Sequence, residues 1–289
     1  MRNVLAMIPG KNMKEYVIVG AHFDHLGIDP ALDGDQIYNG ADDNASGVSA
    51  VLQIARAFLA SGQQPERNVI FAFWDGEEKG LLGSKYFVQT CPFVSQIKGY
   101  LNFDMIGRNN KPEQPKHVVY FYTAAHPSFG DWLKKDIKKY GLQLEPDYRA
   151  WDNPVGGSDN GTFAKAGIPI IWYHTDGHPD YHQPSDHADR LNWDKIWKSP
   201  RLLFLICGRW PMKLHGNSAS LKAVLHLAIK GGRNQLNNHA TYFHLLEIKA
   251  TFFLSDIAFL ICFTALSTGV TQNNPSPFAI AVSTNPGRM

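Results

Sequence analysis

Short apolar runs alternate with amphipathic stretches along most of this 289-residue chain. Residues 69–74, Val-Ile-Phe-Ala-Phe-Trp, form a continuous apolar run, which is typical of a strand buried on both faces of a parallel sheet. Before this run, residues 46–60 place apolar side chains every three or four positions, as an amphipathic helix does. Because such strands and helices alternate, we predict an α/β fold: a mostly parallel mixed sheet sandwiched between helices.

The same patterns predict the remaining elements as far as residue 198. Further strands are expected at residues 3–8, 16–21, 99–105, 117–122 and 168–173, and further helices at 82–89, 127–140 and 160–166. Either Asn44 or Ser46 is expected to cap the helix at 46–60. A loop is expected to carry Trp151, and residues 192–197 begin like a terminal helix that Pro200 interrupts.

The pattern changes after residue 198. The segment 199–289 mixes Leu-rich, Asn-rich and Ser/Thr-rich stretches without a clear strand–helix alternation. We therefore expect a domain at residues 1–198 and an atypical C-terminal tail at 199–289 that is foreign to it. Residues 252–266 are apolar but short for a membrane span and contain Asp256, so a membrane span is not expected.

Composition excludes several classes of function. The formal net charge is +2 and basic residues form no long run, so nucleic acid is not an expected partner. Cys91, Cys207 and Cys262 are scattered and form no CxxC pair, which argues against a disulfide framework and against thiolate metal ligands. No signal-like segment precedes the first predicted strand. We expect either a cytoplasmic protein or the catalytic part of a longer exported precursor.

Carboxylates and histidines follow one predicted strand after another. His22 and Asp24 come after the strand at 16–21, where open α/β sheets bind their ligands. The acidic pair Asp42-Asp43 stands among small residues directly before a helix, so that backbone and metal can approach closely. Taken singly, each feature has an ordinary explanation, such as a surface histidine or a capped helix start.

Further groups of this kind follow later strands. Glu77 and Glu78 follow the buried strand, and two adjacent carboxylates repel each other unless a cation lies close by. Asp104 ends an otherwise apolar strand, and His182 lies beyond the last strand. The nearby histidines compete with His182 for a ligand role, and composition does not choose among them: His174, His178 and His187. Together the groups predict a metal centre.

The chain resembles the zinc aminopeptidase family of clan MH (metallopeptidase family twenty-eight) over residues 3–197. The matching strings are GAHFDH, GADDNASG, DGEEKGLLGS, NFDMIGR, GGSDNGTF and DYHQPSD. The resemblance implies the α/β/α fold of zinc exopeptidases. It implies that His22, Asp43 and Asp104 bind one zinc ion. It further implies that Asp43, Glu78 and His182 bind a second, and that the peptide bond after the bridging Asp43 is cis.

The resemblance also implies a mechanism and a substrate. A hydroxide that bridges the two zinc ions would attack the N-terminal bond of a peptide, with Glu77 as general base. Tyr181 would hydrogen-bond the oxyanion, although Tyr173 is also near. Asp24 and Asp186 would support the ligands. Manganese or cobalt are possible substitutes for zinc.

Some features leave alternatives open. Asn160 stands where family members often have histidine, which bears on the geometry that faces the substrate. The same fold supports a glutaminyl cyclase-like acyltransferase with one zinc ion, and a non-catalytic binding relative. His22 and Asp104 are implied ligands of a second zinc ion, which a one-zinc cyclase does not need. Their presence therefore argues against the cyclase. No ligand or base is missing, which argues against the binding relative. The family resemblance favours export of the parent protein. The sequence does not indicate an oligomeric state.

Overall fold

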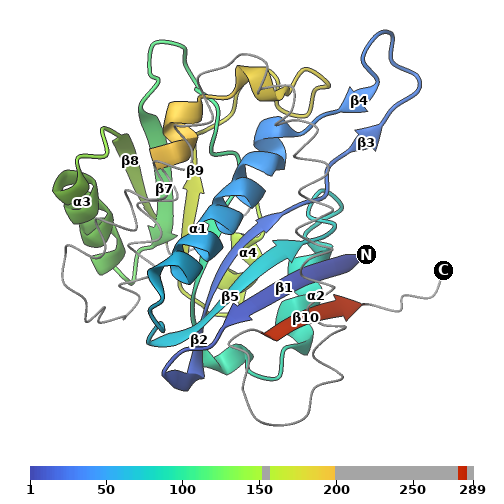
Figure 1. Ribbon diagram of the computed structural model, residues 1–289. Coiled ribbons are helices and arrows are strands. Elements are labelled where there is room, and N and C mark those ends of the chain that lie inside the picture. The colour runs from blue at the N-terminus through green and yellow to red at the C-terminus, as the bar shows by residue number, and fades with distance from the viewer. Residues whose placement is uncertain (152–156, 199–278, 285–289) are drawn as a thin grey trace.

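An eight-stranded sheet with helices on both faces forms the core of the protein (Figure 1). The computed structural model describes residues 1–151, 157–198 and 279–284. Along the sheet the strands lie in the order β10-β1-β5-β2-β6-β9-β7-β8. Their bounds are β1 Arg2–Ile8, β2 Asn12–His22, β5 Arg67–Trp74, β6 Ile97–Phe103, β7 His117–Thr123, β8 Glu145–Trp151, β9 Ile170–His174 and β10 Ala279–Thr284.

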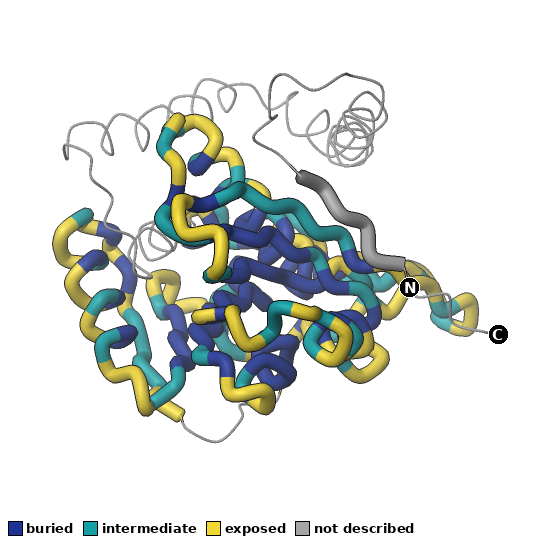
Figure 2. Tube along the Cα trace, turned by 90° about the horizontal axis from the view of Figure 1, so that it is seen from below, coloured by how far each residue is buried: buried dark blue, intermediate teal, exposed yellow. Residues whose placement is uncertain are grey.

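Among the described residues, α1 and α3 cover one face of the sheet, and α2 and α4 cover the other. Their bounds are α1 Gly47–Ser61, α2 Leu82–Thr90, α3 Ser128–Tyr140 and α4 Asn160–Lys165, with short 3-10 helices at Val94–Gln96 and Ala188–Arg190. One core cluster joins the sheet to Ile54 of α1 and Leu133 of α3, and a second joins it to Phe87 of α2 and Phe163 of α4. The central strands are accordingly buried, and exposed segments lie around them (Figure 2).

Strand β2 shows how the sequence divides between the two faces. Val17 and Val19 belong to the cluster under α1, whereas Ile18 between them belongs to the cluster under α2. Successive side chains of a strand point to opposite faces, so a strand covered on both sides must be apolar throughout. Gly20 continues the strand where a Cβ would lie 2.8 Å from Trp74 Nε1 and 2.9 Å from the Tyr100 hydroxyl. Its lack of a side chain makes room for this aromatic pair.

The fold class predicted from the sequence is confirmed. Strands β5, β2, β6 and β9 are mutually parallel in that order, while β1 runs antiparallel to β5 and β7 antiparallel to β9. The sheet is therefore mixed but parallel at its centre. The carboxyl ends of four neighbouring strands consequently meet at one edge, which is where ligands bind in such sheets.

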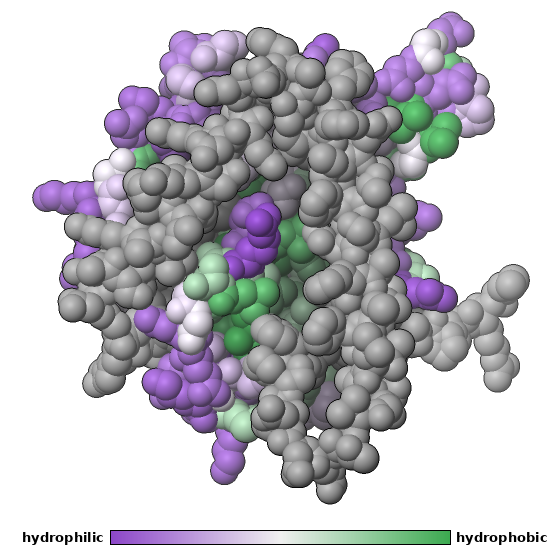
Figure 3. Space-filling model, viewed as in Figure 1, coloured by the Kyte–Doolittle hydropathy of each residue, from purple (hydrophilic) through white to green (hydrophobic). Residues whose placement is uncertain are grey.

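Two segments differ from the prediction. Residues 145–151, expected to be part of a loop, form edge strand β8, parallel to β7. Pro146 and three charged residues interrupt the apolar pattern there. An edge strand tolerates them because one of its sides forms no ladder. Strands β3 (Gly27–Ile28) and β4 (Ile37–Tyr38) pair in a short projecting hairpin, which carries the exposed side chains of Ile28 and Ile37 (Figure 3).

The beginning of α1 shows which of the two expected capping residues acts. The side-chain Oδ1 of Asn44 accepts the N–H of Gly47 at 3.1 Å, as a capping group does. Ser46 occupies the N-cap position but makes no side-chain capping hydrogen bond: its hydroxyl donates to the Asp42 carbonyl at 2.7 Å and accepts the Ile106 N–H at 3.2 Å. Residues Ala41–Ser46 form a short π-helical segment before α1.

The region after residue 198 contributes one described element. Strand β10 pairs antiparallel with β1 at the end of the sheet. The apolar stretch at 252–266 lies outside the described residues, whereas residues 193–198 are helical as expected. No helix within the described part of the chain combines the length and the apolar character that crossing a membrane requires. The domain boundary at residue 198 stays a prediction.

Replacement of residues 199–289 by an amphipathic helix tests that boundary. We expect the shortened chain to keep at least the free energy of unfolding of the full chain, because the described core side chains all lie before residue 198. Urea unfolding of both chains measures the difference. A clear loss of stability would instead identify the tail, with β10, as a structural part of the domain.

Candidate metal centre

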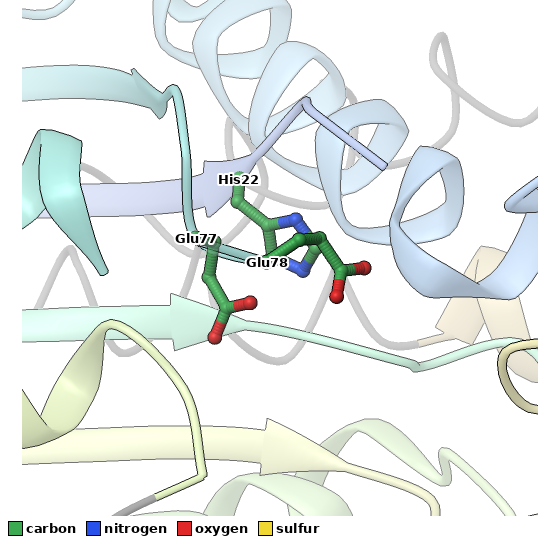
Figure 4. Close-up of side chains that lie close together, drawn as sticks. All are labelled: His22, Glu77 and Glu78. Carbon is green, nitrogen blue, oxygen red and sulfur yellow. The ribbon is translucent and has the colours of Figure 1, made fainter. Parts of the chain in front are cut away.

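The predicted site residues come together at the carboxyl edge of the sheet. His22 is the last residue of β2, and Asp104 directly follows β6. Glu77 and Glu78 lie in the loop after β5, and His182 lies in the loop after β9 (Figure 4 shows His22 with the two glutamates). These four strands are neighbours in the sheet, so parallel topology is what gathers groups that are far apart in sequence.

The first cluster consists of His22, Asp43 and Asp104. The Nε2 atom of His22 lies 3.1 Å from Asp43 Oδ1 and 3.5 Å from Asp104 Oδ1. All three residues are buried. The other ring nitrogen of His22, Nδ1, pairs with the backbone carbonyl of Asp24 at 3.1 Å. A carbonyl only accepts, so Nδ1 carries a proton, and Nε2 is the ring nitrogen that faces the two carboxylates.

The second cluster uses the other oxygen of Asp43. His182 Nε2 lies 3.2 Å from Asp43 Oδ2 and 3.1 Å from Glu78 Oε2. This nitrogen is buried and has no hydrogen-bond partner among the described residues. His182 also has a left-handed backbone with φ of 54°, which is uncommon for a residue with a side chain. The two clusters therefore share one carboxylate, with one oxygen in each.

The donor atoms fit tetrahedral zinc. Ligands about 2.0–2.1 Å from a tetrahedral zinc ion are about 3.3–3.4 Å from one another. The four separations between imidazole nitrogen and carboxylate oxygen in the two clusters are 3.1–3.5 Å. Imidazole and carboxylate are also the donor types that zinc accepts. The residues present thus fit cations held by nitrogen and oxygen.

The peptide bond between Asp43 and Asn44 is cis. This agrees with what the family resemblance implies for the residue shared by both clusters. Asn44 is anchored beside it: its amide donates to the Phe103 carbonyl at 2.9 Å, next to Asp104.

Negative charge concentrates in the buried site. Burial raises the pKa of Glu77 to about 9, and the charges of Asp104, Asp159 and Glu78 add to the rise, although His22 opposes it. Burial also raises the pKa of Asp159 to about 7. For His22, burial acts to lower the pKa, but the charge of Asp104 and its hydrogen bond outweigh this and raise it. A positive charge within the site is therefore strongly favoured.

Two further aspartates hold the backbone of the clusters. Asp24 accepts the N–H of Glu77 at 3.0 Å and that of Glu78 at 3.3 Å. Its carboxylate is 3.7 Å from His22 Nδ1, beyond hydrogen-bond distance, so the Asp24 carbonyl rather than the side chain holds this ring. Asp24 thus orients the glutamate loop through the backbone.

Asp186 holds the backbone of the aspartate loop, the segment that carries Asp42 and Asp43. Its Oδ2 accepts the N–H of Asp42 at 2.8 Å and that of Asp43 at 3.1 Å. Because Asp186 belongs to the same loop as His182, these hydrogen bonds tie the two loops of the second cluster together. Arg108, 3.6 Å from Asp186 Oδ1, also pairs with Asp180 on that loop.

The three competing histidines have other partners. His178 Nε2 lies 3.3 Å from Asp42 Oδ2, and His187 Nε2 lies 3.1 Å from Asp35 Oδ2 on the surface. His174 Nδ1 donates to the backbone carbonyl of Asp104 at 2.7 Å. Of the histidines in this loop region, His182 is the one that contacts Asp43 and Glu78 together.

A cavity of about 190 Å³ opens beside the clusters. Asp43, Glu77 and Asp104 line one part of it, and Trp172 and Tyr181 are among the residues of its wall. The ring of Tyr181 stacks on that of His182 with centroids 3.8 Å apart. Burial raises the pKa of Tyr181 to about 12, so its hydroxyl remains protonated. The cavity thus joins the acidic clusters to an aromatic surface with a hydrogen-bond donor.

The structure also places residues that the sequence did not single out. His25 Nδ1 lies 2.8 Å from Glu78 Oε1, and the string GAHFDH already contains this histidine. Asn102 is buried and donates to the hydroxyl of Ser158 at 2.7 Å and to Asn160 Oδ1 at 3.3 Å. Asn160, the position at which this chain departs from the family, therefore takes part in a buried hydrogen-bond network next to Asp104.

Substitution of Asp24 tests its role in holding the glutamate loop. Asp24→Ala removes the acceptor of two backbone N–H groups, and we expect it to lower the free energy of unfolding by about 1–3 kcal/mol. Asp24→Asn keeps one acceptor oxygen and is expected to lose less. Urea unfolding measures both variants. Equal, negligible losses would show that the loop does not depend on this carboxylate.

The sequence model of peptidase family M28 matches residues 3–206. A curated relative, leupeptin-inactivating enzyme 1 of Streptomyces exfoliatus, is 34% identical over 170 residues, which are 58% of this chain and 34% of that protein. The crystal structure of LapA aminopeptidase from Legionella pneumophila is similar with a TM-score of 0.61 and 28% identity, over 74% of this chain and 56% of that one.

The fold is also similar to that of BSAP, a zinc aminopeptidase from Bacillus subtilis, with a TM-score of 0.60 and 23% identity over 74% of this chain and 51% of that chain. The chain spans about a third to just over half the length of these proteins. The match of the family model, over well more than half of the chain, nevertheless agrees with the site and the fold. This chain belongs to peptidase family M28.

Proposed function

We propose that this protein is a metal-dependent exopeptidase that hydrolyses the N-terminal bond of peptides with the help of two zinc ions. The observation that carries the proposal is the shared carboxylate of Asp43, which has one oxygen in each of two imidazole–carboxylate clusters. Family membership supports the reaction class, since the relatives named above include two aminopeptidases.

His22, Asp43 and Asp104 would hold one ion, and Asp43, Glu78 and His182 the other. When bound, the zinc ions lower the pKa of water and polarise the carbonyl of the bond to be cleaved. A single-metal reaction such as glutaminyl cyclisation needs only one cluster, whereas imidazole nitrogens and carboxylate oxygens lie 3.1–3.5 Å apart in both clusters here. This completeness favours the two-metal hydrolase over that alternative.

Glu77 is the proposed general base. It lines the cavity together with Asp43 and Asp104, and Asp24 holds its backbone N–H. The carboxylates of Glu77 and Glu78 point in different directions (Figure 4). Glu77 lines the cavity, whereas Glu78 Oε2 lies 3.1 Å from His182 Nε2. Cations bound in the two clusters would lower the pKa of Glu77 from its raised value. The ionised carboxylate would then take a proton from the attacking water and pass it to the nitrogen of the leaving amine.

Tyr181 is the proposed donor to the oxyanion. Its hydroxyl stays protonated and its ring lines the cavity, stacked on His182. Tyr173, the alternative, is fully buried and packs against Phe103 and Tyr120 in the core. A hydrogen bond that forms as negative charge develops stabilises the transition state by a few kcal/mol.

The substrate would be a peptide bound in the cavity, with the bond to be cleaved near Glu77. Export of the parent protein stays a prediction that rests on the family resemblance, as does the assignment of zinc over manganese or cobalt.

The number of metal ions can be tested through the shared residue. We expect the full chain to bind two zinc ions, His22→Ala and His182→Ala to bind one each with high affinity, and Asp43→Ala to bind neither tightly. Inductively coupled plasma mass spectrometry after gel filtration gives the metal content. Wild-type protein with one ion or none, under zinc-replete conditions, would contradict the two-ion proposal.

The role of Glu77 is tested by Glu77→Gln. This variant keeps the size of the side chain but removes the base, so we expect unchanged zinc content and a turnover lower by about 10²–10⁴-fold. Hydrolysis of aminoacyl anilides by wild type and variant measures the effect. Glu113→Gln, on the surface, is a suitable control. Wild-type turnover in Glu77→Gln would rule this residue out as the base.

A further inference from the structure

His25 lies three positions after His22, in the loop that follows β2. Its side chain is only 12% exposed, and its Nδ1 lies 2.8 Å from Glu78 Oε1. An ionised carboxylate accepts hydrogen bonds and donates none, so Nδ1 is the donor of this bond. Glu78 therefore has different partners on its two oxygens: His25 on Oε1, and His182 at 3.1 Å from Oε2.

Distances separate the role of His25 from that of a metal ligand. Two donors on one tetrahedral zinc ion lie about 3.3–3.4 Å apart. His182 Nε2 approaches this spacing to both Asp43 and Glu78, at 3.2 and 3.1 Å. His25 Nδ1 also groups with Asp43 and Glu78 within 4.8 Å, but its spacing is uneven: it lies 2.8 Å from Glu78 Oε1, closer than two zinc ligands approach, and 3.9 Å from Asp43 Oδ2.

The backbone is shaped to receive the His25 ring. Gly40, at φ of 58°, directly precedes the π-helical segment that carries Asp43. A Cβ at Gly40 would lie 2.8 Å from Cδ2 of the His25 ring and 2.5 Å from the Asp43 carbonyl oxygen. The ring thus occupies space that only glycine leaves free. On its other side it meets His182 edge to face, with ring centroids 5.8 Å apart.

We propose that His25 is a positioning residue that restricts Glu78 to one ligand oxygen. With Oε1 held by the imidazole, only Oε2 is available to a cation between Asp43, Glu78 and His182. The inference rests on the proposed two-metal function. Groups that hydrogen-bond a metal ligand fix its orientation, and their loss typically weakens metal affinity by about 10–100-fold.

Three variants of the full chain test this role. His25→Phe keeps a ring but removes the donor, and His25→Asn retains an amide donor near the position of Nδ1. His187→Phe is the matched control, because it removes an exposed imidazole that pairs with Asp35 outside the two clusters. Competition with a chromophoric chelator gives the affinities of both zinc ions.

We expect His25→Phe to lower the affinity for one zinc ion by about 10–100-fold and to leave the affinity for the other near the wild-type value. His25→Asn should recover most of the loss, and His187→Phe should match wild type. X-ray absorption of the zinc-loaded protein should give one imidazole per zinc ion on average, from His22 and His182, in wild type and in His25→Phe.

Two results would overturn this inference but not the proposed function. In the first, wild-type protein binds two zinc ions and His25→Phe binds both with unchanged affinity. In the second, the number of imidazoles per zinc ion falls in His25→Phe. The second result would make His25 a ligand rather than a positioning group. Wild-type protein that binds no zinc would overturn the proposed function, and this inference with it.

Discussion

The carboxylate of Asp43 stands between two imidazoles, and the geometry of the site depends on it. One oxygen lies 3.1 Å from His22 and the other 3.2 Å from His182. Because carboxylates gather around it in a buried space, burial together with the charges of Asp104 and Glu78 raises the pKa of Asp43, despite the opposing effect of His22. Such a concentration of like charge is stable only if cations offset it.

Two aspartates next to the clusters, Asp24 and Asp186, hold the acidic loops in place through backbone N–H groups. Asp24 and Asp186 each accept two consecutive N–H groups, one pair in the glutamate loop and one in the aspartate loop. Each aspartate thereby fixes two consecutive peptide units, and the side chains of Glu78 and Asp43 start from a defined backbone. The positions of the oxygens proposed as metal ligands are thus set by hydrogen bonds to residues that do not line the cavity.

Much of this arrangement was predictable because it depends on local pattern. The apolar run at 69–74 identified a buried strand, and parallel topology then brings His22, Glu78 and Asp104 to one edge. The direction of β7 was not predictable because an apolar run does not indicate which way a strand runs. The strand at 145–151 was missed because edge strands carry polar residues and prolines, as loops do. His25 was missed for a different reason: its role follows from the position of Glu78, which is 53 residues away.

Tyr181 and His182 are consecutive residues whose rings stack, so the loop after β9 carries a proposed oxyanion donor and a proposed metal ligand on one rigid unit. Tyr181 lines the cavity, whereas Nε2 of His182 faces Asp43 and Glu78. We infer that metal loading and recognition of the substrate carbonyl are linked: a rotation that carries the imidazole away from Glu78 also withdraws the phenol from the peptide.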